Sequence, residues 1–241
     1  MNKQPIQQNH PTLILIHGAG LDGSVWQPVQ ESLESLYSVR AIDLNGRGEN
    51  LLRQGNSLDI FTQDVLSILD ELQSPAVVVG HSLGGAVAMN VALQQPEHLV
   101  GLGLISTGAK LSVLPTLLAL MESDFDGAVD FLIGLLFHRS LPKVVQQTRN
   151  SMLDTGQSST LRDFQACNSF DVREQLGQIK VPAWICVGEY DQMTPVKFSE
   201  YLAEHISNTT LDTLPDAGHM VMLEQAELFE QHLQQWLNKT F

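Results

Sequence analysis

The chain has 241 residues, of which 43% are hydrophobic, and this length and composition suit one domain with a full core. Its 27 acidic and 13 basic side chains give a formal net charge of −14, so its surface repels nucleic-acid phosphates and anionic lipids. We therefore expect no nucleic-acid partner. Uninterrupted apolar runs, such as those at 131–133 and 135–137, are much too short for a membrane span.

The first residues, MNKQPIQQNHP, are polar and contain two prolines, without the apolar run of a secretory signal. We expect a cytoplasmic protein whose mature chain begins near Met1. The two cysteines are Cys167 and Cys186, and Cys186 lies inside the apolar run AWICVG. A reduced thiol in such a run behaves as a small hydrophobic group, so no structural disulfide is expected.

Short apolar segments rich in β-branched residues alternate along the chain with segments that carry apolar residues at helical spacing. Strands are expected at 12–18, 37–44, 76–82, 99–106, 183–191 and 209–219, and helices at 24–36, 58–72, 84–95, 195–206 and 225–236. Several strands are apolar on both faces, as in parallel strands covered by helices on each side. This order predicts an α/β fold with a mostly parallel central sheet of about six to seven strands flanked by helices.

The alternation stops between residues 110 and 177, where helical patterns continue without any strand-like pattern. We expect a core domain made of residues 1–109 and 178–241, with a helical lid, or cap, at 110–177 inserted late in the sheet. The segment Val129–Phe137 of this lid is apolar on nearly every side. It should therefore pack on the main domain, line a pocket or meet a partner.

The segment VVVGHSLGGAVA, residues 77–88, leads from an apolar strand through one serine between glycines into small helix-forming residues. So abrupt a turn forces Ser82 into a strained backbone conformation, while Gly80 and Gly84 let the helix pass close to the strand. The hydroxyl group then stands exposed above the sheet at a helix N-terminus. The alternative is an ordinary turn serine, but the flanking strand and helix favour a nucleophile.

A serine hydroxyl needs a base that takes its proton during attack, and His219 is the candidate. His219 follows the last expected strand and precedes the last helix, which places it at the carboxyl edge of the sheet, where open α/β sheets bind ligands. Solvated or structural roles are expected for the other seven histidines. Among them, His17 should tie loops together, and His81 should point elsewhere on its turn.

The base in turn needs a carboxylate that fixes its tautomer and stabilises its protonated form. Asp191, in the loop after the next-to-last strand, is the candidate; its neighbour Glu189 sits at the strand end, where a structural role is favoured. Two backbone N–H groups are expected to stabilise the oxyanion of a tetrahedral intermediate. Leu83, directly after the serine, supplies one, and Ala19 in the loop HGAG supplies the other, with a simple glycine turn as the alternative for that loop.

Taken in order, HGAG, DLNGRG, GHSLGG, GEYDQMTP and AGHMVMLE resemble the motifs of the α/β-hydrolase family over nearly the whole chain outside the lid. The resemblance implies a lid at 110–177, a triad of Ser82, Asp191 and His219, and no cofactor or metal. Asn45 and Arg47 replace the usual small residues of DLNGRG, which would alter the pocket rim and not the chemistry. Few residues precede the first strand, so the antiparallel strands that often open this fold should be reduced or missing.

A serine nucleophile disfavours the relatives that displace halide or open epoxides, because these use an aspartate. We expect a serine hydrolase that cleaves carboxylic esters of small to medium, at least partly apolar substrates through an acyl-enzyme. A thioesterase, a carrier-linked methyl-ester esterase, and a carbon–carbon bond hydrolase or lyase on the same triad stay open as alternatives. The intact triad argues against a non-catalytic ligand receptor. The partner is thus a small-molecule ester or thioester, and the oligomeric state is left open between monomer and dimer.

Four basic side chains and one acidic side chain lie between residues 138 and 162 of the lid: Arg139, Lys143, Arg149 and Arg162 against Asp154. This stretch either attracts an anionic substrate or carrier, or only balances the acidic remainder of the chain. If it is helical, its first two cations share a face. The candidate substrate contacts in the lid are Leu117, Phe131, Leu135, Phe137 and Arg139.

Overall fold

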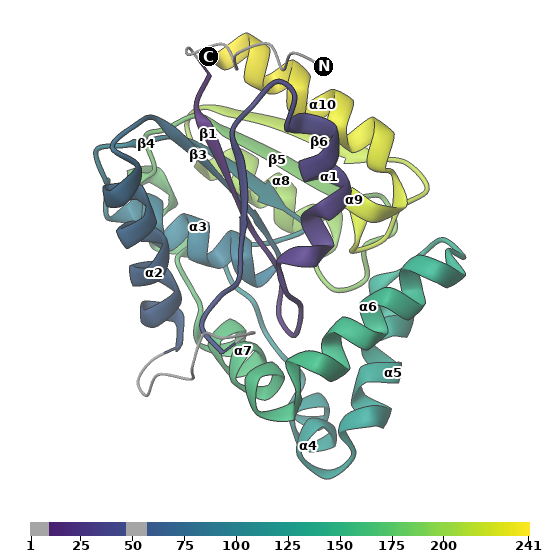
Figure 1. Ribbon diagram of the computed structural model, residues 1–241. Helices are drawn as coiled ribbons and strands as arrows, with labels where there is room; N and C mark the ends of the chain where they lie inside the picture. The colour runs from purple at the N-terminus through teal and green to yellow at the C-terminus, as the bar shows by residue number, and fades with distance from the viewer. Residues whose placement is uncertain (1–9, 47–56) are drawn as a thin grey trace.

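The computed structural model describes residues 10–46 and 57–241 and has three layers, with a sheet between two groups of helices (Figure 1). Six strands form the sheet in the order β2-β1-β3-β4-β5-β6. They are β1 (Thr12–Ile16), β2 (Val39–Ile42), β3 (Ala76–His81), β4 (Leu99–Ile105), β5 (Ala183–Gly188) and β6 (Thr209–Leu214). All neighbouring strands are parallel, which confirms the predicted α/β fold.

Helices cover both faces of the sheet. One face carries α1 (Gln27–Leu33), α9 (Val221–Glu224) and α10 (Ala226–Thr240), and the other carries α2 (Ser57–Leu72), α3 (Leu83–Leu93) and α8 (Val196–His205). Successive side chains of a strand point to opposite faces. Leu13 and Leu15 of β1 therefore pack toward α1 and α10, whereas Ile14 and Ile16 pack toward α2 and α3.

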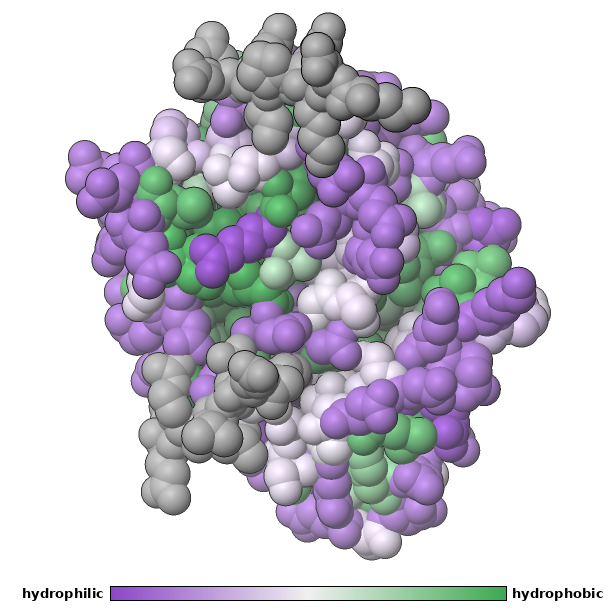
Figure 2. All heavy atoms as spheres, viewed as in Figure 1, coloured by the Kyte–Doolittle hydropathy of each residue, from purple (hydrophilic) through white to green (hydrophobic). Residues whose placement is uncertain are grey.

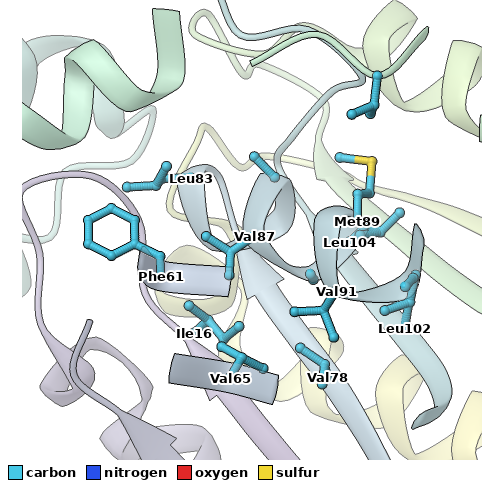
Figure 3. Packing of buried hydrophobic residues seen from close by; sticks show 14 of the residues in the cluster. Ile16, Phe61, Val65, Val78, Leu83, Val87, Met89, Val91, Leu102 and Leu104 are labelled. Carbon is cyan, nitrogen blue, oxygen red and sulfur yellow. The ribbon is translucent and has the colours of Figure 1, made fainter. Parts of the chain in front are cut away.

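The apolar residues at helical spacing in α2 form a stripe that packs on the face of the sheet that also carries α3 and α8. Phe61, Val65 and Leu69 are fully buried. Figure 3 shows Phe61 and Val65 beside Val87 of α3 and Ile16 of β1. Each fully buried side chain of this size contributes roughly 1.5–3 kcal/mol to folding, so the stripe fixes α2 and α3 on the sheet.

The first expected helix, at 24–36, is divided and ends earlier than predicted. A 3₁₀ turn, η1 (Gly23–Trp26), comes first, and α1 then ends at Leu33. Pro28 explains the division, because it lacks a backbone N–H and is tolerated only in the first turn of an α-helix. Asp22 begins the 3₁₀ turn, since its side chain accepts a hydrogen bond from Ser24 N at 2.8 Å.

Four helices lie between β4 and β5, at one end of the sheet (Figure 1). They are α4 (Pro115–Ser123), α5 (Phe125–Leu136), α6 (Pro142–Thr155) and α7 (Gln157–Ser169), followed by the 3₁₀ helix η2 (Arg173–Gln178). We call residues 110–177 the helical insertion. The chain entering it and the chain leaving it pair at an antiparallel bridge between Lys110 and Asp171.

The inner side of the helical insertion packs on the main body, which is one of the outcomes expected for its apolar segment. Val129, Leu132 and Leu136 of α5 are buried in the same cluster as Leu13 and Leu15 of the sheet. Figure 2 shows that the outer surface, seen from the same side, is mostly hydrophilic, with smaller apolar areas. Within the described ranges, no helix combines the length and apolar character needed to cross a membrane.

Candidate active site

Ser82 lies in the turn between β3 and α3 with φ 52° and ψ −113°, the strained conformation that the sequence predicted. A Cβ atom on Gly80 would come within 2.1 Å of the Gly84 carbonyl oxygen, and one on Gly84 within 2.4 Å of the Ile16 carbonyl oxygen. Both positions therefore require glycine, because backbone atoms cannot give way. The turn brings the start of α3 directly over the carboxyl ends of the strands.

His219 and Asp191 form a buried pair at the same edge of the sheet. His219 Nδ1 lies 2.8 Å from Asp191 Oδ2 and 3.0 Å from Oδ1. Both residues are almost fully inaccessible to solvent. Because the ionised carboxylate only accepts, Nδ1 carries the proton, which leaves the other ring nitrogen, Nε2, free to accept one.

Hydrogen bonds from one short loop hold Asp191 in place. Thr194 donates from its backbone N to Oδ1 and from its hydroxyl to Oδ2, each at 2.8 Å, and Met193 N donates to Oδ1 at 2.9 Å. Burial raises the pKa of Asp191, but the facing His219 and these donors outweigh it, so the pKa lies below its ordinary value. Asp191 is therefore an ionised carboxylate aimed at the imidazole. The rival Glu189 is exposed.

Ser82 and His219 line one cavity of about 230 Å³. Its walls are mainly apolar and include Leu117, Leu132 and Leu135 of the helical insertion. The topology explains the meeting of distant residues: the strand order reverses between β1 and β3, and the loops after β3, β5 and β6 all open at this edge. The cavity is mainly apolar and small, with a few polar groups in its lining, as expected for an organic ligand of modest size.

The two oxyanion candidates flank the serine. Ala19 also lines the cavity, and Leu83 begins α3 directly after Ser82. In the described part of the chain, neither backbone N–H is bonded to a protein acceptor. The loop of Ala19 is held by the next residue, since Gly20 N donates to the buried Asp163 carboxylate at 2.9 Å. His17 Nε2 accepts from Leu44 N at 3.1 Å, so it ties two loops together as predicted.

Three of the five predicted lid contacts lie elsewhere. Leu117 and Leu135 line the cavity, but Phe131, Phe137 and Arg139 do not. Along α5 the cavity is lined by residues 132, 135 and 136, and Phe131 is 47% exposed. An apolar helix segment has only one face toward a cavity, and the sequence did not indicate which one.

The basic stretch of the helical insertion is mostly engaged in contacts within the protein. Arg139 Nε lies 3.3 Å from Asp216, Arg149 Nε donates to Asp130 at 2.6 Å, and Arg162 Nη1 donates to Asn45 at 3.0 Å. Arg139 precedes α6, which begins at Pro142, so the condition for a face shared with Lys143, a helix that includes both residues, is not met. Of the replaced residues in DLNGRG, Asn45 is buried, and Arg47 lies outside the described residues.

His81 lines the cavity, whereas the sequence analysis expected its side chain to point elsewhere on the turn. Its ring centre lies 4.8 Å from that of His219, and its Nε2 lies 3.1 Å from the His219 carbonyl oxygen. A carbonyl only accepts, so Nε2 carries the proton and positions the His219 backbone. Burial, followed by the neighbouring His219, lowers the pKa of His81 to about 3. His81 therefore stays neutral beside the base.

Glu224 is a second residue that sequence reasoning missed. This buried carboxylate accepts hydrogen bonds from Gly218 N at 2.8 Å, His138 N at 2.8 Å and Arg139 N at 2.7 Å. It thereby joins the loop of His219 to the helical insertion. The sequence shows that Glu224, now at the end of the short helix α9, follows closely after His219. It does not show the partners of Glu224 across the fold.

Within residues 10–46 and 57–241, no group of three or more His, Cys, Asp or Glu side chains is arranged to hold a metal ion. The polar groups at the cavity instead include a hydroxyl, an imidazole backed by a carboxylate, and backbone N–H groups. This set can move a proton and stabilise a developing negative charge, as nucleophilic acyl transfer requires.

Comparisons with known proteins agree with this geometry. Residues 13–232 match the family model described as the alpha/beta hydrolase family. The 3-oxoadipate enol-lactonase 1 of Acinetobacter baylyi is 28% identical over 93% of this chain and 87% of its own. The pimeloyl-[acyl-carrier protein] methyl ester esterase of Nitrosomonas europaea is 29% identical over 92% of this chain and 93% of its own.

A solved structure described as a thermophilic esterase is 34% identical and superposes with a TM-score of 0.85 over 97% of this chain and 91% of that one. The family match and this relative each cover most of the chain. The chain therefore belongs to the alpha/beta hydrolase family, and the expectation of a hydrolytic enzyme drawn from its motifs is confirmed.

Proposed function

We propose that Ser82, His219 and Asp191 form the catalytic triad of a carboxylic ester hydrolase. Ser82 Oγ attacks the ester carbonyl carbon while His219 Nε2 takes the hydroxyl proton, and Asp191 stabilises the resulting imidazolium. The N–H groups of Ala19 and Leu83 receive the oxyanion. The intermediate then expels the alcohol, which leaves with the proton from His219.

The second half of the reaction repeats these roles with water. His219 deprotonates a water molecule that attacks the acyl-enzyme, and the carboxylic acid leaves as Ser82 regains its proton. One observation carries the proposal: a buried carboxylate–imidazole pair shares a cavity with a serine held at φ 52°. Strain of this kind persists where the surrounding structure fixes it, as it does at nucleophiles.

The substrate is proposed to be an ester of small to medium size with an apolar portion. The mainly apolar cavity of about 230 Å³ supports this class, with Leu117 and Leu135 as contacts. The names of both curated relatives describe enzymes that act on an ester bond, since a lactone is a cyclic ester. This favours ester cleavage over carbon–carbon cleavage.

The helical insertion is proposed to act as the cap of this site, because its residues line the cavity. The cytoplasmic location also remains a proposal. It is supported by Cys167 and Cys186, which are buried and unpaired, as suits a reducing compartment.

Replacement of the nucleophile tests the function directly. We expect Ser82→Ala to lower kcat for methyl and p-nitrophenyl esters by about 10⁴-fold or more, because the triad acts as one unit. Its urea unfolding midpoint should stay near that of the parent protein. The matched control is Ser67→Ala, on the exposed face of α2, which should keep full activity. Unchanged turnover in Ser82→Ala would refute the proposal.

A further inference from the structure

A second cavity adjoins the active-site cavity. Its volume is about 340 Å³, and Ser112 and Phe198 line both cavities. Lys110, Arg173 and Lys197 bring three cationic groups to its wall. Such a grouping contrasts with the formal net charge of −14 that the whole chain carries.

One carboxylate, that of Asp171, pairs with two of these cations. It lies 3.2 Å from Lys110 Nζ and 2.7 Å from Arg173 Nη2. Lys197 makes no ion pair with any carboxylate in the described ranges; its Nζ lies 5.9 Å from the ring centre of Phe198. The described residues that line this cavity therefore include three cations and no carboxylate, with Asp171 beside two of the cations.

The backbone holds these cations in fixed places. Lys110 and Asp171 pair as an antiparallel bridge, and Val172 N donates to Ala109 O at 2.8 Å. Lys197 is in the first turn of α8, three residues after Thr194, which holds Asp191. The backbone thus connects Lys110 to the start of the helical insertion, and it connects Lys197 to the loop of Thr194 that holds Asp191.

An apolar wall connects the two cavities. Leu111 and Val113, on either side of Ser112, line the active-site cavity, as do Met193 and Phe198. A substrate chain that passes from Ser82 toward Ser112 therefore meets hydrocarbon first and cations afterwards. This order matches a molecule with an ester at one end, an apolar chain, and an anionic group at the other end.

We propose that the second cavity binds the anionic end group of the substrate through Lys110, Arg173 and Lys197. The proposal rests on the proposed esterase function and narrows its substrate class to esters whose apolar chain ends in an anion such as a carboxylate. Lys197 supplies a point charge that forms no ion pair with a carboxylate of the described residues. The attraction between the partly exposed cations and the anion orients the ester and lowers KM.

Two matched series of esters test the assignment. One contains monomethyl esters of six- to nine-carbon dicarboxylic acids, and the other contains methyl esters of the monocarboxylic acids of equal length. In the parent protein, we expect the ratio of kcat/KM for the anionic over the neutral ester to reach a maximum at one chain length. Lys197→Glu should lower that maximum ratio by about tenfold, mostly through KM, and Lys197→Gln should lower it less.

The matched control is Lys239→Glu, which changes the net charge equally on the exposed side of α10 and should leave the ratio unchanged. An unchanged ratio in Lys197→Glu, or an equal fall in Lys239→Glu, would overturn the proposal. Urea unfolding of both variants separates a loss of fold from a loss of charge.

A binding measurement separates this proposal from the esterase function. Ser82→Ala protein is titrated by calorimetry with the anionic ester of the preferred length, or with the nine-carbon ester if none is hydrolysed. Binding that weakens about tenfold when Lys197→Glu is added supports the cationic cavity even if the parent protein hydrolyses neither series. Binding that is the same with and without Lys197→Glu refutes it.

Discussion

Ser82 illustrates how neighbouring residues fix a single strained conformation. Its N–H donates to Ile105 O at 2.9 Å, and its carbonyl oxygen accepts from Thr107 Oγ1 at 2.8 Å and from Gly85 N at 2.9 Å. These bonds to β4, to the loop after it and to α3 outweigh the cost of a positive φ, roughly 1–3 kcal/mol. The proposed nucleophile is therefore oriented before the substrate arrives, which would remove an entropic cost from the reaction.

His81 gives a prediction for the pH dependence of stability. The unfolded chain binds a proton at this residue near the ordinary pKa of 6.5, whereas the folded protein binds it only near pH 3. Between these values the unfolded state holds more protons, so the free energy of unfolding falls as the pH falls, by up to about 1.4 kcal/mol per pH unit. Above pH 6.5 the residue has no such effect.

The test is urea unfolding of the parent protein and His81→Asn at several pH values between 4 and 7. We expect the slope of the unfolding free energy against pH to decrease in the variant by close to one proton. Equal slopes for the two proteins would show that His81 takes up its proton as readily in the folded state, contrary to its burial beside His219.

The helical insertion contacts two loops of the proposed active site as well as lining the cavity. Leu136 O, at the end of α5, accepts hydrogen bonds from His219 N at 3.0 Å and Met220 N at 3.1 Å. On the other side, Asp163 of α7 holds Gly20, next to the oxyanion candidate Ala19. The insertion therefore positions the proposed base and the proposed oxyanion loop together.

Glu224 allows this coupling to be tested. In Glu224→Gln, an NH₂ group replaces one oxygen and faces backbone donors, so a buried N–H loses its acceptor. We expect a loss of about 1–3 kcal/mol in unfolding free energy and a fall of about tenfold in kcat/KM, from displacement of His219. The control, Glu227→Gln on the exposed side of α10, should change neither quantity. Equal stability of the two variants would contradict the assigned role.

Across the whole molecule, the features that the sequence predicts are those fixed by local patterns of residues. The six parallel strands follow from apolar runs of the sequence. The sharp turn at Ser82 follows from Gly80 and Gly84, because a side chain at either position would collide with nearby backbone atoms. Asp191 and His219 could be predicted because strand order alone brings the loops after parallel strands to one edge. The sheet and the candidate triad could therefore be predicted from the sequence alone.

The remainder depends on contacts between distant segments. Which side of α5 faces the cavity, and thus the place of Phe131, is decided by how the helix packs on the sheet. Arg139 was expected at the substrate but pairs with Asp216, 77 positions further along the chain. The cations of the second cavity come from three separate segments, so no local pattern could have grouped them.

Covalent trapping tests whether His219 activates Ser82 as the nucleophile. The protein is incubated with an aryl phosphonate ester, and the modified residue is identified by mass spectrometry. We expect one phosphonyl group per chain on the peptide containing Ser82, formed at least 100-fold more slowly in His219→Ala and absent in Ser82→Ala. An active protein that stays unlabelled at Ser82, or is labelled there equally fast without His219, would contradict the account.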